Sequence, residues 1–270
     1  MSCLLDKTFL ESIPKRPDTV VNIDSEFSSH EWNQYNFGPS AVFEYILSDD
    51  TMRPDLFVIC SISERSMKKT SKIIISMLHV IEKKYRRVFI MKFCHMNNMI
   101  KEAHEAACAK RDRIKLEETK FITKKETAST PEQYIYVSNK REYYKPEMDF
   151  YNVLATMVSY IITSELKLTN VELLGKSAGG CIAILVANIK NYKALYLASP
   201  ASPFYLSDLK NKNMKVHIGW PCNDLKYNHM KGNYDSIMET FTNYSSRIYS
   251  YIEQSDGHEL HPDMLCDIIL

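Results

Sequence analysis

The stretch VELLGKSAGGCIAILVANI, residues 171–189, places a lysine and a serine in a glycine-rich corner between two apolar runs. Residues 175–177, GKS, match the end of a phosphate-binding loop, where a lysine and a serine contact nucleotide phosphates. Residues 175–179, GKSAG, also match G-x-S-x-G, the pattern of a serine nucleophile carried on a sharp turn. The corner therefore predicts either a nucleotide site or a centre that attacks carbonyl groups.

The spacing of the glycines decides against the nucleotide site. A phosphate-binding loop needs G-x-x-x-x-G-K-S/T, because its first glycine opens the ring of amides around the phosphates. Asn170 stands where that glycine would be, and the intervening residues, VELL, belong to a predicted strand. The sequence also lacks a G-x-G-x-x-G dinucleotide turn. These features favour the nucleophile turn.

Glycine is scarce in this chain, with seven in 270 residues, where average usage of about 7% would give about nineteen. Gly175, Gly179 and Gly180 all fall in the corner. A sharp turn leaves no room for Cβ atoms two residues before and after the serine, so both flanks need glycine. Such a turn holds the Ser177 hydroxyl at a helix N-terminus, whose dipole favours developing negative charge.

A nucleophilic serine needs a general base and an acid that orients the base. Asp224 follows the predicted strand at 214–221, and His258 follows the predicted strand at 246–253. Loops after parallel strands share one edge of a sheet, which is also the edge that carries the nucleophile turn. We therefore expect Ser177, Asp224 and His258 to converge there as a catalytic triad.

Other residues compete for these roles. Asp256 stands two residues before His258, a position more typical of a turn former than of the catalytic acid. His261 is the alternative base, although the sequence His-Pro-Asp is typical of a helix start. Cys60 and Cys222 lie near the same sheet edge, but neither has the glycine corner that presents a nucleophile.

Three further residues near the corner carry open interpretations. Lys176 either binds an acidic group of the substrate, or faces solvent or pairs locally. Trp220 either forms a pocket wall or packs in the core. His217 alternates inside a predicted strand, which favours packing over catalysis.

Predicted strands and helices alternate along the chain, which is typical of an α/β protein with a mostly parallel sheet and helices on both faces. Apolar and β-branched runs predict an antiparallel pair of strands at 19–27 and 41–49. They predict six further strands: one that leads into the corner, and five at 54–63, 87–94, 193–200, 214–221 and 246–253. Helical periodicity predicts one helix directly after the corner and others at 66–86, 146–168, 234–244 and 261–270.

The segment 95–145 interrupts this alternation. Its fifty or so residues exceed an ordinary connection, and they include a charged, helix-compatible stretch at 99–120. We expect one domain over residues 1–270, with 95–145 inserted as a cap-like segment near the carboxyl edge of the sheet. A solvated excursion with no role in binding is the alternative.

The order Ser177, Asp224, His258, with G-x-S-x-G after a strand, resembles the α/β-hydrolase superfamily of serine hydrolases. The resemblance spans roughly 54–94 and 146–270. It implies that Ser177 is the nucleophile, His258 the general base and Asp224 the acid that fixes the imidazole tautomer.

The resemblance also implies an oxyanion hole, made from the amide after the nucleophile and an amide from the loop after the strand at 54–63. The first donor is Ala178, and the nearest candidates for the second are Ser61 and Ile62. That loop reads SISERS and lacks the HGGG or HG sequence of the family. The family commonly places its lid after the strand at 193–200, where this chain has only a short link.

Composition limits the other possibilities. Formal net charge is +1, with 34 basic and 33 acidic residues, so no overall field attracts nucleic acid or an anionic membrane. No apolar run has the length of a membrane span, and no secretory signal is visible at the N-terminus. Seven scattered cysteines without C-x-x-C pairs favour reduced thiols in the cytoplasm and give no support for a metal site.

The sequence therefore predicts an intracellular serine hydrolase without a cofactor, which cleaves an ester, thioester, or amide or peptide acyl bond through an acyl-enzyme. Its partner would be a small-molecule or peptide acyl substrate, whose identity and acyl length the sequence leaves open, as it does the oligomeric state. The alternative is a catalytically silent protein of the same fold that binds or scaffolds.

Overall fold

The structure is a computed structural model of the whole chain. It describes residues 27, 31–37, 40–93, 102, 105–107, 109, 148–200, 209–211, 213–221, 248–253 and 260–269. The predicted strand at 19–26, the predicted helix at 234–244 and most of the segment 95–145 lie outside the described residues. Within that segment, residues 102, 105–107 and 109 are helical, as the sequence predicted.

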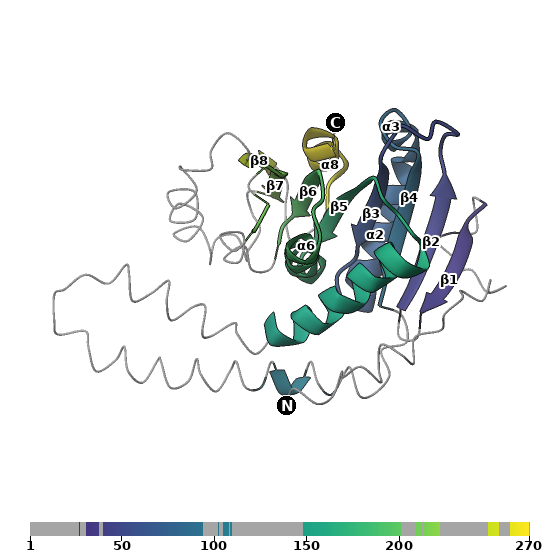
Figure 1. Cartoon of the computed structure of the whole chain (residues 1–270). Coiled ribbons are helices and arrows are strands. Elements are labelled where there is room, and N and C mark those ends of the chain that lie inside the picture. The colour runs from purple at the N-terminus through teal and green to yellow at the C-terminus, as the bar shows by residue number, and fades with distance from the viewer. Residues whose placement is uncertain are drawn as a thin grey trace.

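The centre of the fold is an eight-stranded sheet with the order β1-β2-β4-β3-β5-β6-β7-β8 (Figure 1). Strands β3 to β8 run parallel, and β1 and β2 form an antiparallel pair that joins the sheet through β4. The strands are β1 Asn33–Phe37, β2 Ser40–Ile46, β3 Asp55–Ile59, β4 Arg87–Lys92, β5 Val171–Lys176, β6 Ala194–Ala198, β7 Lys215–Pro221 and β8 Ile248–Glu253. The predicted α/β class with a mostly parallel sheet is confirmed.

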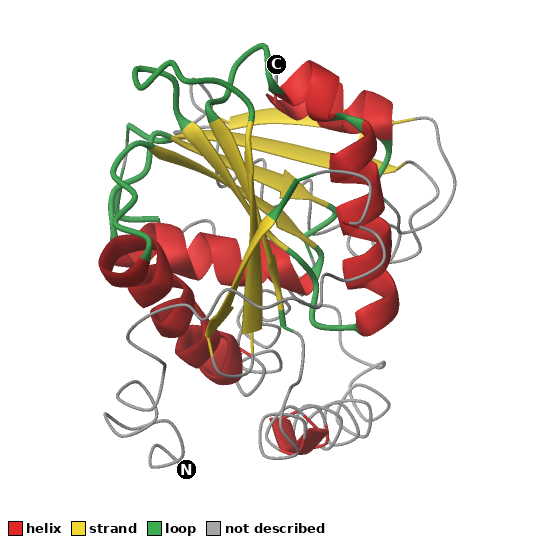
Figure 2. Cartoon of the chain, turned by 90° about the vertical axis from the view of Figure 1, so that its right-hand side faces the viewer, coloured by secondary structure: helices red, strands yellow, loops and turns green. Residues whose placement is uncertain are grey.

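Helices cover both faces of the sheet (Figure 2). The described helices are α2 Glu64–Ser76, α3 Leu78–Ile81, a helix at 148–160 that continues as the π-helical turn Ile161–Glu165, α6 Ala178–Ile189 and α8 Pro262–Ile269. Every residue of β3, β5 and β6 is buried, because these central strands carry helices on each side. No helix in the described ranges is long and apolar enough to cross a membrane.

Two predicted elements differ from the structure. The partner of β2 in the antiparallel pair is β1, whereas the sequence predicted a strand at 19–27, whose one described residue, Phe27, lies in a 3-10 turn. β1 reads NQYNF, and it contains too many polar residues to match the apolar pattern that predicted the other strands. An edge strand tolerates them because it pairs on one side only. The helix predicted at 66–86 divides at Met77, whose φ of −105° and ψ of 8° separate α2 from α3.

The buried carboxylate of Glu172 connects the sheet to the turn after α3 and, through Lys84, to the end of α8. Glu172 in β5 accepts hydrogen bonds from the hydroxyls of Tyr85 at 2.7 Å and Tyr196 at 2.8 Å. The Lys84 ammonium lies 3.4 Å from the same oxygen and donates to the Ile269 carbonyl at 2.6 Å. A cation is favourable at this end of a helix, so the cluster fixes the last turn of α8.

We expect Glu172→Leu to lower the free energy of unfolding by about 2–3 kcal/mol, because it leaves two hydroxyls and an ammonium without their common acceptor. Urea unfolding would measure the loss. The control is Glu64→Gln, which breaks the exposed ion pair with Lys68 at 2.8 Å and should cost less than about 0.5 kcal/mol. Equal effects in the two variants would show that the Glu172 cluster does not stabilise the fold.

Candidate active site

Ser177 lies between β5 and α6 in a conformation that non-glycine residues rarely adopt. Its φ is 56° and its ψ is −120°, and a residue in such a region costs about 1–3 kcal/mol unless its surroundings enforce it. Hydrogen bonds hold the backbone on both sides: its N–H donates to the Ala198 carbonyl at 3.0 Å, and its carbonyl accepts from the Gly180 N–H at 2.9 Å. The strand and the helix thus fix where the Ser177 side chain leaves the backbone.

The two glycines around Ser177 stand where no side chain fits, as the sequence predicted. A Cβ at Gly175 would lie 2.5 Å from the Gly179 carbonyl oxygen and 2.6 Å from the Gly180 Cα. A Cβ at Gly179 would overlap the Ile59 carbonyl oxygen and lie 2.6 Å from that of Cys60. The first contact is between β5 and α6, and the second is between α6 and the end of β3. Three elements therefore approach one another at backbone distance around the serine.

The close approach at Gly179 brings the loop after β3 to the start of α6. The Cys60 N–H donates to the Met91 carbonyl at 3.2 Å, so it is already engaged within the sheet. The next two residues, Ser61 and Ile62, are 6% and 9% exposed. Ala178 is the first residue of α6, where an N–H has no acceptor within its own helix. The three residues predicted to supply oxyanion donors thus belong to two backbone segments that meet beside Ser177.

Lys176 does not face solvent. Its side chain is 2% exposed, which removes the solvent-facing interpretation that its charge suggested. Because side chains alternate along a strand, Lys176 points to the face opposite Gly175, away from α6. A second lysine, Lys92 at the end of β4, is also 2% exposed. Both buried cations lie at the carboxyl edge of the sheet.

The other predicted triad members lie outside the described residues, but the strands that lead to them are described. Asp224 follows the end of β7 by three residues, and His258 follows the end of β8 by five. Both strands are parallel to β5 and end at the same edge of the sheet. Trp220 belongs to β7 and pairs with Ile252 of β8.

The structure describes two of the four residues that compete for the triad roles, Cys60 and His261. Asp256 and Cys222 lie outside the described residues, and Cys60 is fully buried. His261 directly precedes α8, and its carbonyl accepts from the Leu265 N–H at 2.9 Å, which confirms the predicted helix start. In the described part of the chain, no group of three or more His, Cys, Asp or Glu side chains could hold a metal ion.

His217 packs inside the fold, as its place in a strand predicted. It is half-buried in β7, with its ring 5.1 Å from the ring of Tyr196. Burial is the main reason that the pKa of His217 falls to about 4. The nearby cations Lys84 and Lys215 contribute to the same shift, and Glu172 opposes it. The His217 imidazole is therefore neutral near pH 7.

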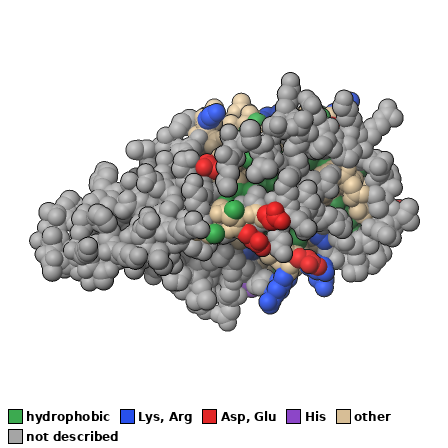
Figure 3. All heavy atoms as spheres, turned by 90° about the horizontal axis from the view of Figure 1, so that it is seen from below, with side chains coloured by type: hydrophobic (Ala, Val, Ile, Leu, Met, Phe, Trp, Pro, Cys, Tyr) green, Lys and Arg blue, Asp and Glu red, His purple; other side chains and the backbone are tan. Residues whose placement is uncertain are grey.

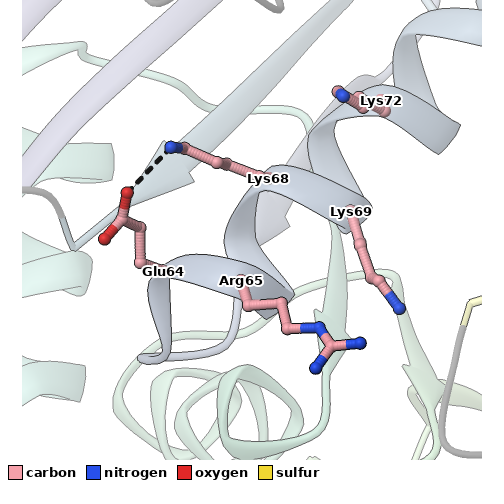
Figure 4. A pocket seen from close by; sticks show the side chains of 5 residues that line it. All are labelled: Glu64, Arg65, Lys68, Lys69 and Lys72. Atoms are coloured by element: carbon pink, nitrogen blue, oxygen red, sulfur yellow. Dashed lines mark ion pairs between the residues drawn. The ribbon is translucent and has the colours of Figure 1, made fainter.

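A hollow of about 350 Å³ opens beside α2 (Figure 4). The described side chains that line it are all charged: Glu64, Arg65, Lys68, Lys69 and Lys72. They point away from the sheet, because the buried face of α2 carries Met67 and Ile74. In Figure 3, which shows the molecule from below, acidic and basic side chains lie side by side on the described surface. The described lining of the hollow beside α2 carries four basic side chains and one acidic side chain.

No protein-family model and no curated protein sequence matches this chain. A solved structure of a predicted CIB-like hydrolase from Thermoplasma acidophilum aligns over 88% of this chain and 94% of its own, with a TM-score of 0.52 and 12% identity. An α/β serine hydrolase without a lid from Xanthomonas campestris aligns over 84% and 85%, with a TM-score of 0.48 and 12% identity. An α/β serine hydrolase homologue from Coxiella burnetii aligns over 87% and 92%, with a TM-score of 0.48 and 10% identity. At such identities, the likeness to the Thermoplasma structure shows a shared fold.

We expect Gly179→Ala to destabilise the protein by about 3 kcal/mol or more, because its Cβ has no space against the carbonyl groups that end β3. Thermal and urea unfolding would measure the loss. Gly180→Ala is the matched control, since its Cβ would lie 3.1 Å from the Cβ and 3.2 Å from the Cα of Pro200, contacts that a movement of a few tenths of an ångström would relieve. We expect that variant to stay within about 1 kcal/mol of the wild type. Similar stability of the two variants would contradict the crowding at Gly179.

The His217 pKa gives a pH prediction. The folded value of about 4 lies below the ordinary 6.5, so the unfolded chain binds the proton first, and stability falls as the pH drops from about 6.5 to about 4. His217→Gln should reduce this decline in urea unfolding at a series of pH values. The exposed His79→Gln is the control and should keep the wild-type profile. If stability declines in His217→Gln as it does in the wild type, the lowered pKa of His217 is not the cause of the decline.

Proposed function

We propose that this chain, which has the α/β-hydrolase fold, is a serine hydrolase that cleaves an ester, thioester or amide acyl bond through Ser177. The single observation that carries the proposal is the backbone of Ser177, with a positive φ between a buried strand and a helix and glycines at both flanks. A residue in this conformation is costly, and such residues cluster at active sites. Packing alone would be served better by a glycine.

In the proposed mechanism, the Ser177 hydroxyl oxygen attacks the carbonyl carbon of the substrate while His258 accepts the hydroxyl proton. Asp224 orients the imidazole and stabilises the imidazolium that forms. The carbonyl double bond becomes a single bond to a negatively charged oxygen. As the tetrahedral intermediate collapses, the bond to the leaving group breaks, and His258 gives the leaving group its proton. Water then attacks the acyl-enzyme by the same route and releases the acid.

The oxyanion would accept hydrogen bonds from the Ala178 N–H and from an N–H of Ser61 or Ile62. Removal of one such donor typically raises the barrier by about 3 kcal/mol. The dipole of α6, a twelve-residue helix that begins at Ala178, favours negative charge at the same point. The close backbone approach at Gly179 supports this pair of donors, because it brings the loop after β3 beside the start of α6.

We expect a fluorophosphonate probe to label the wild type and short-chain p-nitrophenyl esters to be hydrolysed, and Ser177→Ala to abolish both. The control is Ser76→Ala, in which an exposed serine of α2 is replaced and both readouts should persist. In the same assay, Asp224→Asn and His258→Ala should each lower kcat by about 10³-fold or more.

Labelling that survives Ser177→Ala would place the nucleophile elsewhere. A folded wild type that shows neither labelling nor turnover would favour the silent binding or scaffold protein instead.

A further inference from the structure

Four basic side chains follow one face of α2 beside the hollow (Figure 4). Arg65, Lys68, Lys69 and Lys72 are spaced i, i+3, i+4 and i+7, so each is a neighbour of two others on the helix surface. With Glu64, the described lining carries a formal charge of +3, four cations less one carboxylate. The whole chain carries only +1, so positive charge is concentrated at this hollow.

This placement of cations is unfavourable for α2 itself. Arg65 and Lys72 each repel both Lys68 and Lys69, because like charges three or four residues apart on a helix lie close together. Arg65, Lys68 and Lys69 also lie in the first two turns of a thirteen-residue helix, the end at which the helix dipole disfavours cations. The ion pair of Lys68 with Glu64, at 2.8 Å, offsets part of this repulsion. An arrangement that weakens its own helix indicates a role in binding.

The start of α2 offers a second feature that suits an anion. Ser63 at the N-cap makes no side-chain hydrogen bond to the first turn, so its hydroxyl does not satisfy the N–H groups that lack acceptors there. These N–H groups and the positive end of the helix dipole favour a negatively charged ligand. The hollow beside them, of about 350 Å³, has the size of a small-molecule site, for which about 300–1,000 Å³ is usual.

We propose that the hollow beside α2 binds the phosphate groups of a small molecule through Arg65, Lys68, Lys69 and Lys72. A phosphate group carries a charge of about −1.5 to −2 at pH 7, so a ligand with two of them matches the formal charge of +3 better than a single carboxylate does. The Arg65 guanidinium has the planar fork that donates two parallel hydrogen bonds to one phosphate. The concave shape fits a compact ligand better than a flat membrane surface.

The phosphate groups have two possible sources. α2 begins two residues after Ile62, and the loop before it lies against Gly179 at the candidate active site. The ligand is therefore either the phosphate-bearing part of the acyl substrate or a separate phosphorylated compound bound beside the site. Only the first source rests on the proposed function, because binding at α2 does not require Ser177 to react.

Calorimetric titration of the full chain with inorganic pyrophosphate tests the site. We expect binding that weakens as salt is added, because the contacts lie at the surface. Arg65→Gln/Lys69→Gln should weaken binding by about tenfold or more, since two charged donors are lost. Glu64→Gln should tighten binding by about two- to fivefold, because it removes the carboxylate that repels the anion and pairs with Lys68.

The control is Lys190→Gln/Lys193→Gln, which removes two exposed lysines between α6 and β6 and should bind pyrophosphate as the wild type does. The midpoint of thermal unfolding of Arg65→Gln/Lys69→Gln should stay the same or rise, because repulsion within α2 is relieved.

Three results would overturn the proposal. The first is a wild type that does not bind pyrophosphate, including one that instead binds vesicles of phosphatidylserine and phosphatidylcholine. The second is equal weakening in the two double variants, which would show a general effect of surface charge. The third is weaker binding in Glu64→Gln, which would show that the carboxylate contributes a favourable contact.

Two thioesters with the same acetyl group separate the two sources of phosphate. Acetyl-coenzyme A carries phosphate groups, and S-acetylpantetheine carries none. If the phosphates belong to the substrate, the ratio of kcat/KM for the two thioesters should fall by about tenfold in Arg65→Gln/Lys69→Gln and stay unchanged in the control. An unchanged ratio with weakened pyrophosphate binding would assign the site to a separate phosphorylated compound. A wild type that binds pyrophosphate but lacks fluorophosphonate labelling would refute the proposed function and still support the phosphate site.

Discussion

Close backbone approach at Gly179 is the constraint on which the candidate site depends. The start of α6 lies against the carbonyl groups of Ile59 and Cys60, while Gly175 in β5 lies against Gly179 and Gly180. Three elements can meet at this distance only where side chains are absent. The same contact fixes the conformation of Ser177 and brings the loop after β3 to the N-terminus of the helix. One steric requirement thus places both the proposed nucleophile and the proposed oxyanion donors.

The sequence predicted this part of the molecule because steric requirements restrict residue type. Glycines in a chain that otherwise avoids them marked the turn, and the buried run VELL marked the strand before it. Burial on both faces likewise made β3, β5 and β6 visible as continuous apolar runs. Asp224 and His258 stay predictions, because the structure describes only the strands that lead to them.

Other features could not be predicted because they depend on distant parts of the chain. The edge strand β1 is polar in sequence, and its pairing depends on β2. Lys176 looks like a surface residue by type, yet it is 2% exposed at the end of a strand in which every residue is buried. The buried hydroxyl of Ser199 has no hydrogen-bond partner among the described residues, and the tripeptide Ala-Ser-Pro at 198–200 gives no sign of this.

The described polar residues differ between the amino ends and the carboxyl ends of the parallel strands. Toward the amino ends of the strands, buried carboxylates are matched by cations: Arg87 contacts Asp55 at 2.7 Å and Glu44 at 3.1 Å, and Lys84 lies near Glu172. Ion pairs of this kind, supported by tyrosine hydroxyls, tie neighbouring strands and α8 together. At the carboxyl ends, Ser177 and Ser199 instead hold backbone conformations that cost free energy. Such conformations persist only when the rest of the structure enforces them, and the fully buried strands β5 and β6, which end beside Ser177 and Ser199, supply that support.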